Sequence, residues 1–267
     1  MQVAPAPAYC VAQAETTLLT DGGFQITGNA ADSLIVETGS TLILGSAGTA
    51  TAFPTNFGVN LDPASTVTYN AGVAQVISAA PAYGHLTIQG AGAKSTGASS
   101  TLTVGGTMTL AAGTFAPGAN AVVALSGDWT NNGGAFTAGT STVQFVSTSS
   151  AQAINGSAAS QTFNAMTVSK GGTSLGVGGS TTSLTTGALT MTSGTFAIAN
   201  ATNVNGTLTL TSGTLAVGMG TLTLNSTVSG SGTTITSAAT GTVIYNQSSA
   251  GQSVVAANYG NLTFSNF

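Results

Sequence analysis

Along most of the chain, apolar residues and hydroxyl-bearing residues alternate one by one. Leu208 and Leu210 alternate with the threonines at 207, 209 and 211, and Leu222 and Leu224 repeat the pattern. Successive side chains of a β-strand point to opposite faces, so this alternation predicts strands with an apolar inner face and a hydroxyl outer face. The 3.6-residue period of an amphipathic helix is missing. The pattern therefore predicts an all-β protein.

A short unit recurs inside this pattern. The segment 107–115 (TMTLAAGTF) matches 188–196 (ALTMTSGTF) and 207–215 (TLTLTSGTL), and the last two copies lie 19 residues apart. That spacing suits one turn of a β-solenoid, with about three strands of ~5 residues and tight corners. We therefore expect an elongated β-solenoid of the parallel β-helix type. The alternative is one or more antiparallel β-sandwiches with strand addition between subunits, because sandwich strands alternate in the same way.

A longer, irregular unit occurs three times. It starts with a strand at 65–70, 141–146 or 241–246, and it passes through Gln75, Gln152 or Gln252. It ends in an aromatic residue and a short apolar strand at 83–88, 163–168 or 259–264. Periods of tens of residues are typical of stacked arrays. The third copy stops at Phe267, where the other two continue, and we expect this unfinished repeat to offer a surface for another chain.

Three regions are expected along the chain. Residues 1–14 form an extended arm rich in proline and alanine, residues 15–64 an irregular β region or cap, and residues 65–267 the repetitive strand domain, which ends within a repeat. Unpaired strand edges associate readily. The candidates for contact between subunits are Val11, Leu18, Leu19, Phe24 and Ile26 near one end, and Tyr259, Leu262, Phe264 and Phe267 near the other. Cys10 either links two chains or is an idle small residue, and the sequence leaves both open.

The charge content is very low. Only 3% of the residues are charged, against about 25% in an average protein, and the net charge is −4 with no arginine. Neutral, threonine-rich strands with few charges tend to associate edge to edge. This composition favours a homopolymer over a freely diffusing protein. The lack of a basic patch argues against nucleic-acid binding, and the lack of a run of ~18 apolar residues argues against a membrane span.

The chain offers little material for catalysis. Its only histidine is His85, and the same place in the other long repeats holds Ala165 and Asn261. A glycoside hydrolase needs two carboxyl groups across a cleft, and the regular part of the chain offers Asp128 and, at its margin, Asp62. We therefore expect no enzymatic activity and no cofactor.

Two further ligands remain open from the sequence. Calcium binding is a minor alternative, because hard cations need several oxygen ligands but no Asp-x-Asp-x-Asp spacing is present. The acidic candidates for such a site are Asp21, Asp32, Glu37 and Asp62. Six Asn-x-Ser/Thr sequons could carry glycans, at Asn155, Asn200, Asn205, Asn225, Asn246 and Asn261.

Several stretches resemble a known class of repeats. These are 127–134 (GDWTNNGG), 136–140 (FTAGT), 241–246 (GTVIYN) and 259–264 (YGNLTF). They resemble the β-strand repeats of large secreted bacterial surface proteins, the adhesin-like and filamentous-haemagglutinin-like exoproteins, over about residues 65–267. The resemblance implies an extracellular, non-enzymatic, β-rich shaft at the cell surface.

Together these features lead to two functional hypotheses. The first is a structural subunit of an extracellular filament or cell-surface fibre, which polymerises head-to-tail by β-edge completion or strand addition. The second is an adhesin or carbohydrate-binding shaft segment of a larger secreted protein, with glycans or other surface proteins as partners.

Overall fold

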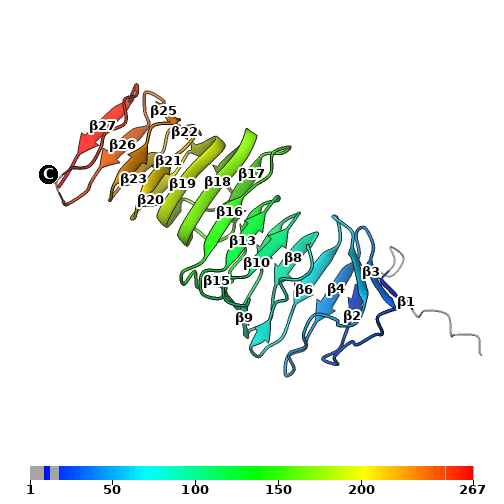
Figure 1. Ribbon diagram of the computed structural model, residues 1–267. Coiled ribbons are helices and arrows are strands. Elements are labelled where there is room, and N and C mark those ends of the chain that lie inside the picture. Colours follow the sequence, from blue (N-terminus) through cyan, green and yellow to red (C-terminus); the bar gives the residue numbers. More distant parts are fainter. Residues whose placement is uncertain (1–8, 13–17, 250, 267) are drawn as a thin grey trace, which may run out of the picture.

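The chain forms an elongated β-solenoid of about 12 turns (Figure 1). The computed structural model describes residues 9–12, 18–249 and 251–266. Every strand pairing among these residues is parallel. The solenoid prediction is therefore confirmed, and the antiparallel sandwich alternative is wrong. The described part of the chain contains no helix that could cross a membrane.

Each turn of the chain passes over three faces, and each face is built from parallel strands. The first face holds β1 (Tyr9–Ala12), β3 (Ser33–Val36), β5 (Gly58–Leu61), β10 (Thr101–Val104), β13 (Val122–Leu125), β16 (Thr142–Phe145), β21 (Leu208–Leu210) and β24 (Val228–Gly230). The second holds β2 (Leu18–Thr20), β4 (Thr41–Leu44), β6 (Thr66–Tyr69), β8 (His85–Ile88), β11 (Met108–Leu110), β14 (Trp129–Asn131), β17 (Gln152–Gly156), β22 (Gly213–Val217) and β25 (Thr233–Ser237).

The third face begins as a four-stranded sheet and continues after the middle of the rod. It holds β7 (Gln75–Val76), β9 (Ala93–Ser95), β12 (Thr114–Ala116), β15 (Ala135–Phe136), β20 (Ala201–Val204), β23 (Thr221–Leu224), β26 (Thr242–Tyr245) and β27 (Asn261–Phe264). Two long strands, β18 (Ser160–Val177) and β19 (Ser183–Ile198), bend around all three faces and pair with each other along most of their length.

The alternation seen in the sequence places like residues in columns inside the rod. On the second face Leu42, Val67, Leu86, Met108 and Trp129 follow one another in register, and each is fully buried. Complete burial of an aliphatic side chain of this size contributes about 1.5–3 kcal/mol. Each inward-facing position of a strand forms such a column, and these columns therefore hold successive coils together.

Glycine is required where corners of adjacent coils touch. Gly90 and Gly113 both have positive φ, 73° and 68°. A Cβ atom on Gly113 would lie 2.0 Å from the carbonyl oxygen of Gly90, and one on Gly90 would lie 2.3 Å from that of Asn70. A larger residue would meet both a strained backbone and a main-chain clash.

Most of the described aromatic side chains are buried, and their ring contacts form three separate clusters. The largest surrounds Trp129, whose ring centroid lies 4.8 Å from that of Phe136 and 5.1 Å from that of Phe163. The other two clusters centre on Tyr83 and Tyr245. Edge-to-face contacts of this kind stabilise beyond their buried area, so the buried aromatic residues serve the core.

Candidate association surfaces at the two ends

The two strands of each long repeat lie side by side as successive rungs of the solenoid. Thr66 pairs with His85, Thr142 with Ala165, and Thr242 with Asn261. Each copy of the repeat is therefore one complete coil. This equivalence lets the three copies be compared position by position.

Each of these coils closes around a buried glutamine. The side chain of Gln252 accepts a hydrogen bond from the Gln247 amide at 3.1 Å and donates to the carbonyls of Leu224 and Ser226 at 2.9 and 2.7 Å. Gln152 bonds the Ser147 amide and the carbonyls of Leu125 and Gly127 in the same way. Gln75 does so with Ala71, Leu44 and Thr51. This glutamine clasp ties each corner to the preceding coil.

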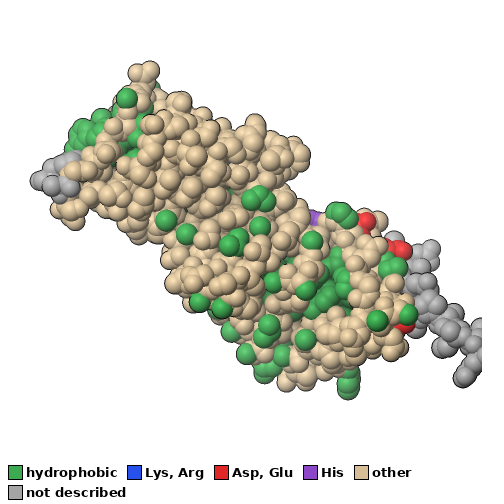
Figure 2. All heavy atoms as spheres, in the orientation of Figure 1, with side chains coloured by type: hydrophobic (Ala, Val, Ile, Leu, Met, Phe, Trp, Pro, Cys, Tyr) green, Lys and Arg blue, Asp and Glu red, His purple; other side chains and the backbone are tan. Residues whose placement is uncertain are grey.

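The last described coil presents its inner face to solvent. Leu262 is 39% exposed and Phe264 is 51% exposed, whereas the equivalent Leu86 and Ile88 on β8 are fully buried. The difference arises because β11 covers β8, while the described residues place a neighbouring strand only on the β26 side of β27. Figure 2 shows hydrophobic side chains gathered at this end of the rod. We call β27 and Tyr259 the C-terminal surface.

Tyr259 anchors the C-terminal surface to the coil beneath it. Its hydroxyl lies 2.8 Å from that of Tyr245 and donates to the carbonyl of Val255. Burial, followed by the hydrogen bond and the charge of Tyr245, raises the pKa of Tyr259 well above its ordinary value. The buried pair therefore favours the neutral form of the phenol.

The opposite end of the rod also exposes apolar side chains. Leu18 on β2 is 54% exposed and Phe24 is 81% exposed. Ile26 is half-buried, and the half-buried Leu19 packs against the core. We call Leu18, Leu19, Phe24 and Ile26 the N-terminal surface. The structure thus groups the predicted contact residues into two surfaces at opposite ends of the rod (Figure 1).

Two of the predicted contact residues are less fully defined. Val11 lies in β1, where it pairs with Ile35, but its side chain is outside the described part of the structure. Phe267 lies outside the described residues, as do residues 1–8, 13 and 14 of the expected arm.

Both lysines are buried and bind main-chain carbonyls. The Lys94 ammonium donates to the carbonyls of Ala71 and Gly92 at 2.6 and 2.9 Å, and that of Lys170 donates to Ser150 and to the side chain of Gln152 at 2.9 and 2.6 Å. Burial lowers the pKa of Lys94, and it lowers that of Lys170 to about 8 against an opposing effect of Asp128. The lysines therefore brace corners instead of facing solvent.

The remaining polar candidates also hold the coil together. Asp128 accepts hydrogen bonds from the Ala153 amide at 2.8 Å and from the Asn155 side chain at 3.2 Å. His85 Nδ1 accepts one from the Thr107 amide at 2.9 Å. Each group joins one coil to the next along the second face.

The acidic residues proposed for calcium are engaged by turns. Asp21 accepts hydrogen bonds from the amides of Gly23 and Gly45 and from the Thr51 hydroxyl, and Asp62 accepts one from the Ala64 amide. Across residues 9–12, 18–249 and 251–266, no three His, Cys, Asp or Glu side chains come together. The described residues thus hold no preformed cluster of metal ligands.

The sequence showed the recurring glutamines and the isolated lysines but not what they do. A glutamine at the same place in three otherwise variable turns, and a lysine in a chain almost free of charge, were the available signals. Each of these side chains binds at least one group about one coil away along the chain, so pattern reading alone could not pair them.

Comparisons with known proteins identify no relative. No family model matches the chain, and neither a curated protein nor a solved structure matches it.

Proposed function

We propose that this protein is a structural subunit of an extracellular filament or cell-surface fibre. In this arrangement the C-terminal surface of one copy stacks on the N-terminal surface of the next. The proposal is supported chiefly by the contrast between β27 and β8, the same position of the repeat in two states of burial. The resemblance of the repeats to those of secreted bacterial surface proteins supports the extracellular location.

The direction of the strands suits stacking from end to end. Because all described pairings are parallel, the strands of a second copy placed head-to-tail run in the same direction as those of the first copy on every face. An asymmetric contact of this kind repeats without closing and gives an open filament. Strand edges supply main-chain hydrogen bonds, and burial of Leu262 against the apolar N-terminal surface adds hydrophobic stabilisation.

The low charge of the rod supports the same assembly. Neither lysine faces solvent, and the acidic side chains concentrate near the N-terminal end (Figure 2). Copies therefore approach each other with little electrostatic repulsion.

Electron microscopy and light scattering of the purified chain test this proposal. We expect fibres of uniform width from the parent, and loss of fibres in Leu262→Lys, which places a charge in the contact. The matched control is Met219→Lys, because Met219 is 80% exposed on the corner between β22 and β23, outside the last described coil. Monomers from the parent, or fibres of equal length from Leu262→Lys, would refute the end-to-end contact.

An adhesin or carbohydrate-binding shaft is the second candidate. It is favoured by the outward polar columns of the third face, where Thr162, Thr185, Asn203 and Thr223 follow one another in register. Hydroxyl and amide groups at regular spacing suit neutral sugars. A monomeric parent that binds a glycan array would support this candidate, and no binding by a monomeric parent would count against it.

A further inference from the structure

The first face is interrupted between its third and fourth coils. β5 pairs with β3 on one side, and the described residues place no strand on its other side. In the fourth coil only Tyr83 makes a ladder contact on this face, with Val104 of β10. One rung of an otherwise continuous sheet is therefore absent beside β5.

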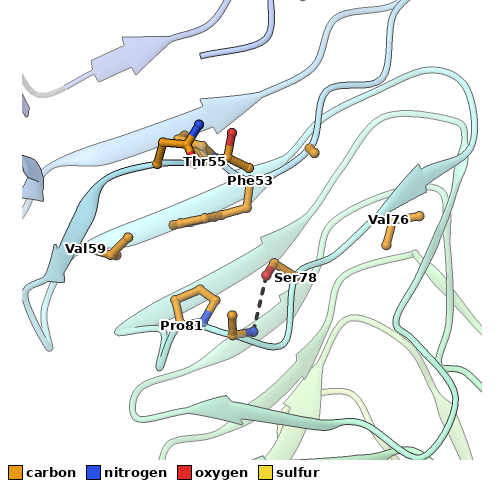
Figure 3. Close-up of a pocket in the computed structure, with 10 residues that line it drawn as sticks. Phe53, Thr55, Val59, Val76, Ser78 and Pro81 are labelled. Atoms are coloured by element: carbon orange, nitrogen blue, oxygen red, sulfur yellow. Dashed lines mark hydrogen bonds between the residues drawn. The ribbon is translucent and has the colours of Figure 1, made fainter. Parts of the chain in front are cut away.

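The residues of the fourth coil explain why no strand forms there. Pro81 has no amide hydrogen to donate to a ladder. A hydrogen bond within the bend before Pro81 stabilises it: the Ala80 amide donates to the Ser78 hydroxyl at 3.2 Å (Figure 3). The chain bends away before it returns to the face at Tyr83.

The gap leaves main-chain groups of β5 available. The amides of Gly58 and Asp62 donate to the carbonyls of Asp32, just before β3, and of Val36 at its end, at 2.8 and 2.9 Å. Main-chain groups of successive residues in a strand point to alternate sides. Those of Val59 and Leu61 therefore point into the gap, and within the described residues no hydrogen bond joins them to the fourth coil.

An apolar groove of about 480 Å³ lies along this edge. Phe53 and Val59 line one side, and Val76 and Pro81 line the other (Figure 3). Val59 is in register with the fully buried Leu34, yet it is 42% exposed because no side chain of a next rung covers it. A strand laid in this Phe53 groove would complete both the ladder and the inward column.

The surroundings of the Phe53 groove define the charge of an occupant. The groove-lining side chains carry no charge. The nearest carboxylate in the sequence is that of Asp62, which is half-buried and directly follows β5. A ligand with a neutral apolar centre and a basic residue beside Asp62 therefore complements the site.

The geometry points to the Phe53 groove as a binding site for an extended segment of a partner protein, which adds as a strand to the free edge of β5. The segment would be apolar at alternate positions and carry lysine or arginine beside them. Strand addition of this type combines main-chain hydrogen bonds with pockets for alternate side chains. The site lies on the side of the rod, so it is independent of contacts between ends.

A synthetic peptide tests this site directly. The probe is a fluorescent, end-capped peptide that places the β10 sequence TLTV between two lysines, and fluorescence anisotropy measures its binding to the full chain. The same peptide with alternate main-chain nitrogens methylated cannot form the ladder, and a version flanked by glutamates has the wrong charge. We expect both to bind the parent more weakly, the methylated one by at least about tenfold, from the loss of two or more hydrogen bonds.

Variants of the groove separate this site from nonspecific adhesion. Val59→Pro removes the amide that faces the gap and leaves the β3 ladder in place, and Val59→Lys fills the groove with a charge. Both should lose the probe, whereas Val254→Lys, at a valine of similar exposure (45%), should retain it. Circular dichroism of each variant confirms that the fold is kept.

Three results would overturn the proposal. They are no binding of the lysine-flanked peptide to the parent, equal binding of the methylated peptide, and equal binding by the Val59 variants. A parent that is dimeric in light scattering, with a monomeric Val59→Lys variant, would also overturn it and assign the groove to a second copy of this chain.

Discussion

The hydroxyls of Tyr69 and Tyr83 lie 2.8 Å apart and together bind both main-chain polar groups of Ser78. The Ser78 amide donates to the Tyr69 hydroxyl at 3.1 Å, and the Tyr83 hydroxyl donates to the Ser78 carbonyl at 2.7 Å. Tyr245, Tyr259 and Val255 repeat this arrangement at the other end of the rod. The paired tyrosines therefore replace ladder hydrogen bonds where the chain leaves the sheet.

Replacement of Tyr69 by phenylalanine should destabilise the rod by about 1–3 kcal/mol, because the Ser78 amide loses its partner inside the protein. Urea unfolding followed by circular dichroism measures the change. The matched variant Tyr245→Phe should cost less, since the hydrogen bond between the Tyr245 and Tyr259 hydroxyls is partly buried, whereas that between Tyr69 and Tyr83 is buried. Equal losses would show that burial does not govern the cost.

Alkaline pH should weaken the fold through the same pair. Burial raises the pKa of Tyr69 to about 12, and burial together with Tyr69 raises that of Tyr83 further. Above the ordinary tyrosine pKa of about 10 the unfolded chain releases protons that the folded chain retains. The stabilisation is complete below about pH 10 and is lost as the pH rises through about 12. The urea midpoint should fall over this range.

The double variant Tyr69→Phe and Tyr83→Phe is the control for the pH effect. It lacks both phenols, so its urea midpoint should change less between about pH 10 and 12 than that of the parent. An equally steep fall in the double variant would assign the pH dependence to other groups.

Replacement of Gln152 by alanine should cost about 3 kcal/mol or more. The change removes a buried clasp and leaves the Ser147 amide and the carbonyls of Leu125 and Gly127 without that partner. Gln144 is a suitable control, because it lies on the outer side of β16, and Gln144→Ala should change stability by less than about 0.5 kcal/mol. Similar losses from both changes would contradict a special role for the clasp.

Replacement of Gly113 by alanine should disrupt the corner that stacks on Gly90. The positive φ and the 2.0 Å approach to a carbonyl oxygen leave no room for a methyl group. We expect either insoluble protein or a loss of several kcal/mol, about 3 or more, in thermal or urea unfolding. Gly176→Ala is the control: a Cβ there meets no atom within 4 Å, so the change should be tolerated.

The architecture could be predicted from the sequence because its signals are local and periodic. The alternation at Leu208 and Leu210 correctly identified the inward positions, and the 19-residue spacing correctly matched one coil, since Leu189 pairs with Leu208. These properties depend only on side-chain direction in a strand and on stacking of like on like.

The side chains that stabilise corners could not be assigned in this way. Lys94 and Gln152 bind carbonyls of preceding coils, and such partners depend on how each corner packs. The gap beside Val59 was also missed, although Pro81 signals it in retrospect, because a proline within one rung removes a donor. Pattern reading finds repeated features, whereas the Phe53 groove arises from a departure from the repeat.

The burial of Lys94 and Lys170 has a consequence for the chemistry of the intact rod. They are the only lysines of the chain, which has no arginine, and both are fully enclosed. Trypsin can cleave this polypeptide only after these residues, so digestion requires a coil to open first. Proteolysis by trypsin, and labelling of lysines by amine-reactive dyes, should therefore report the opening of the coils around residues 94 and 170.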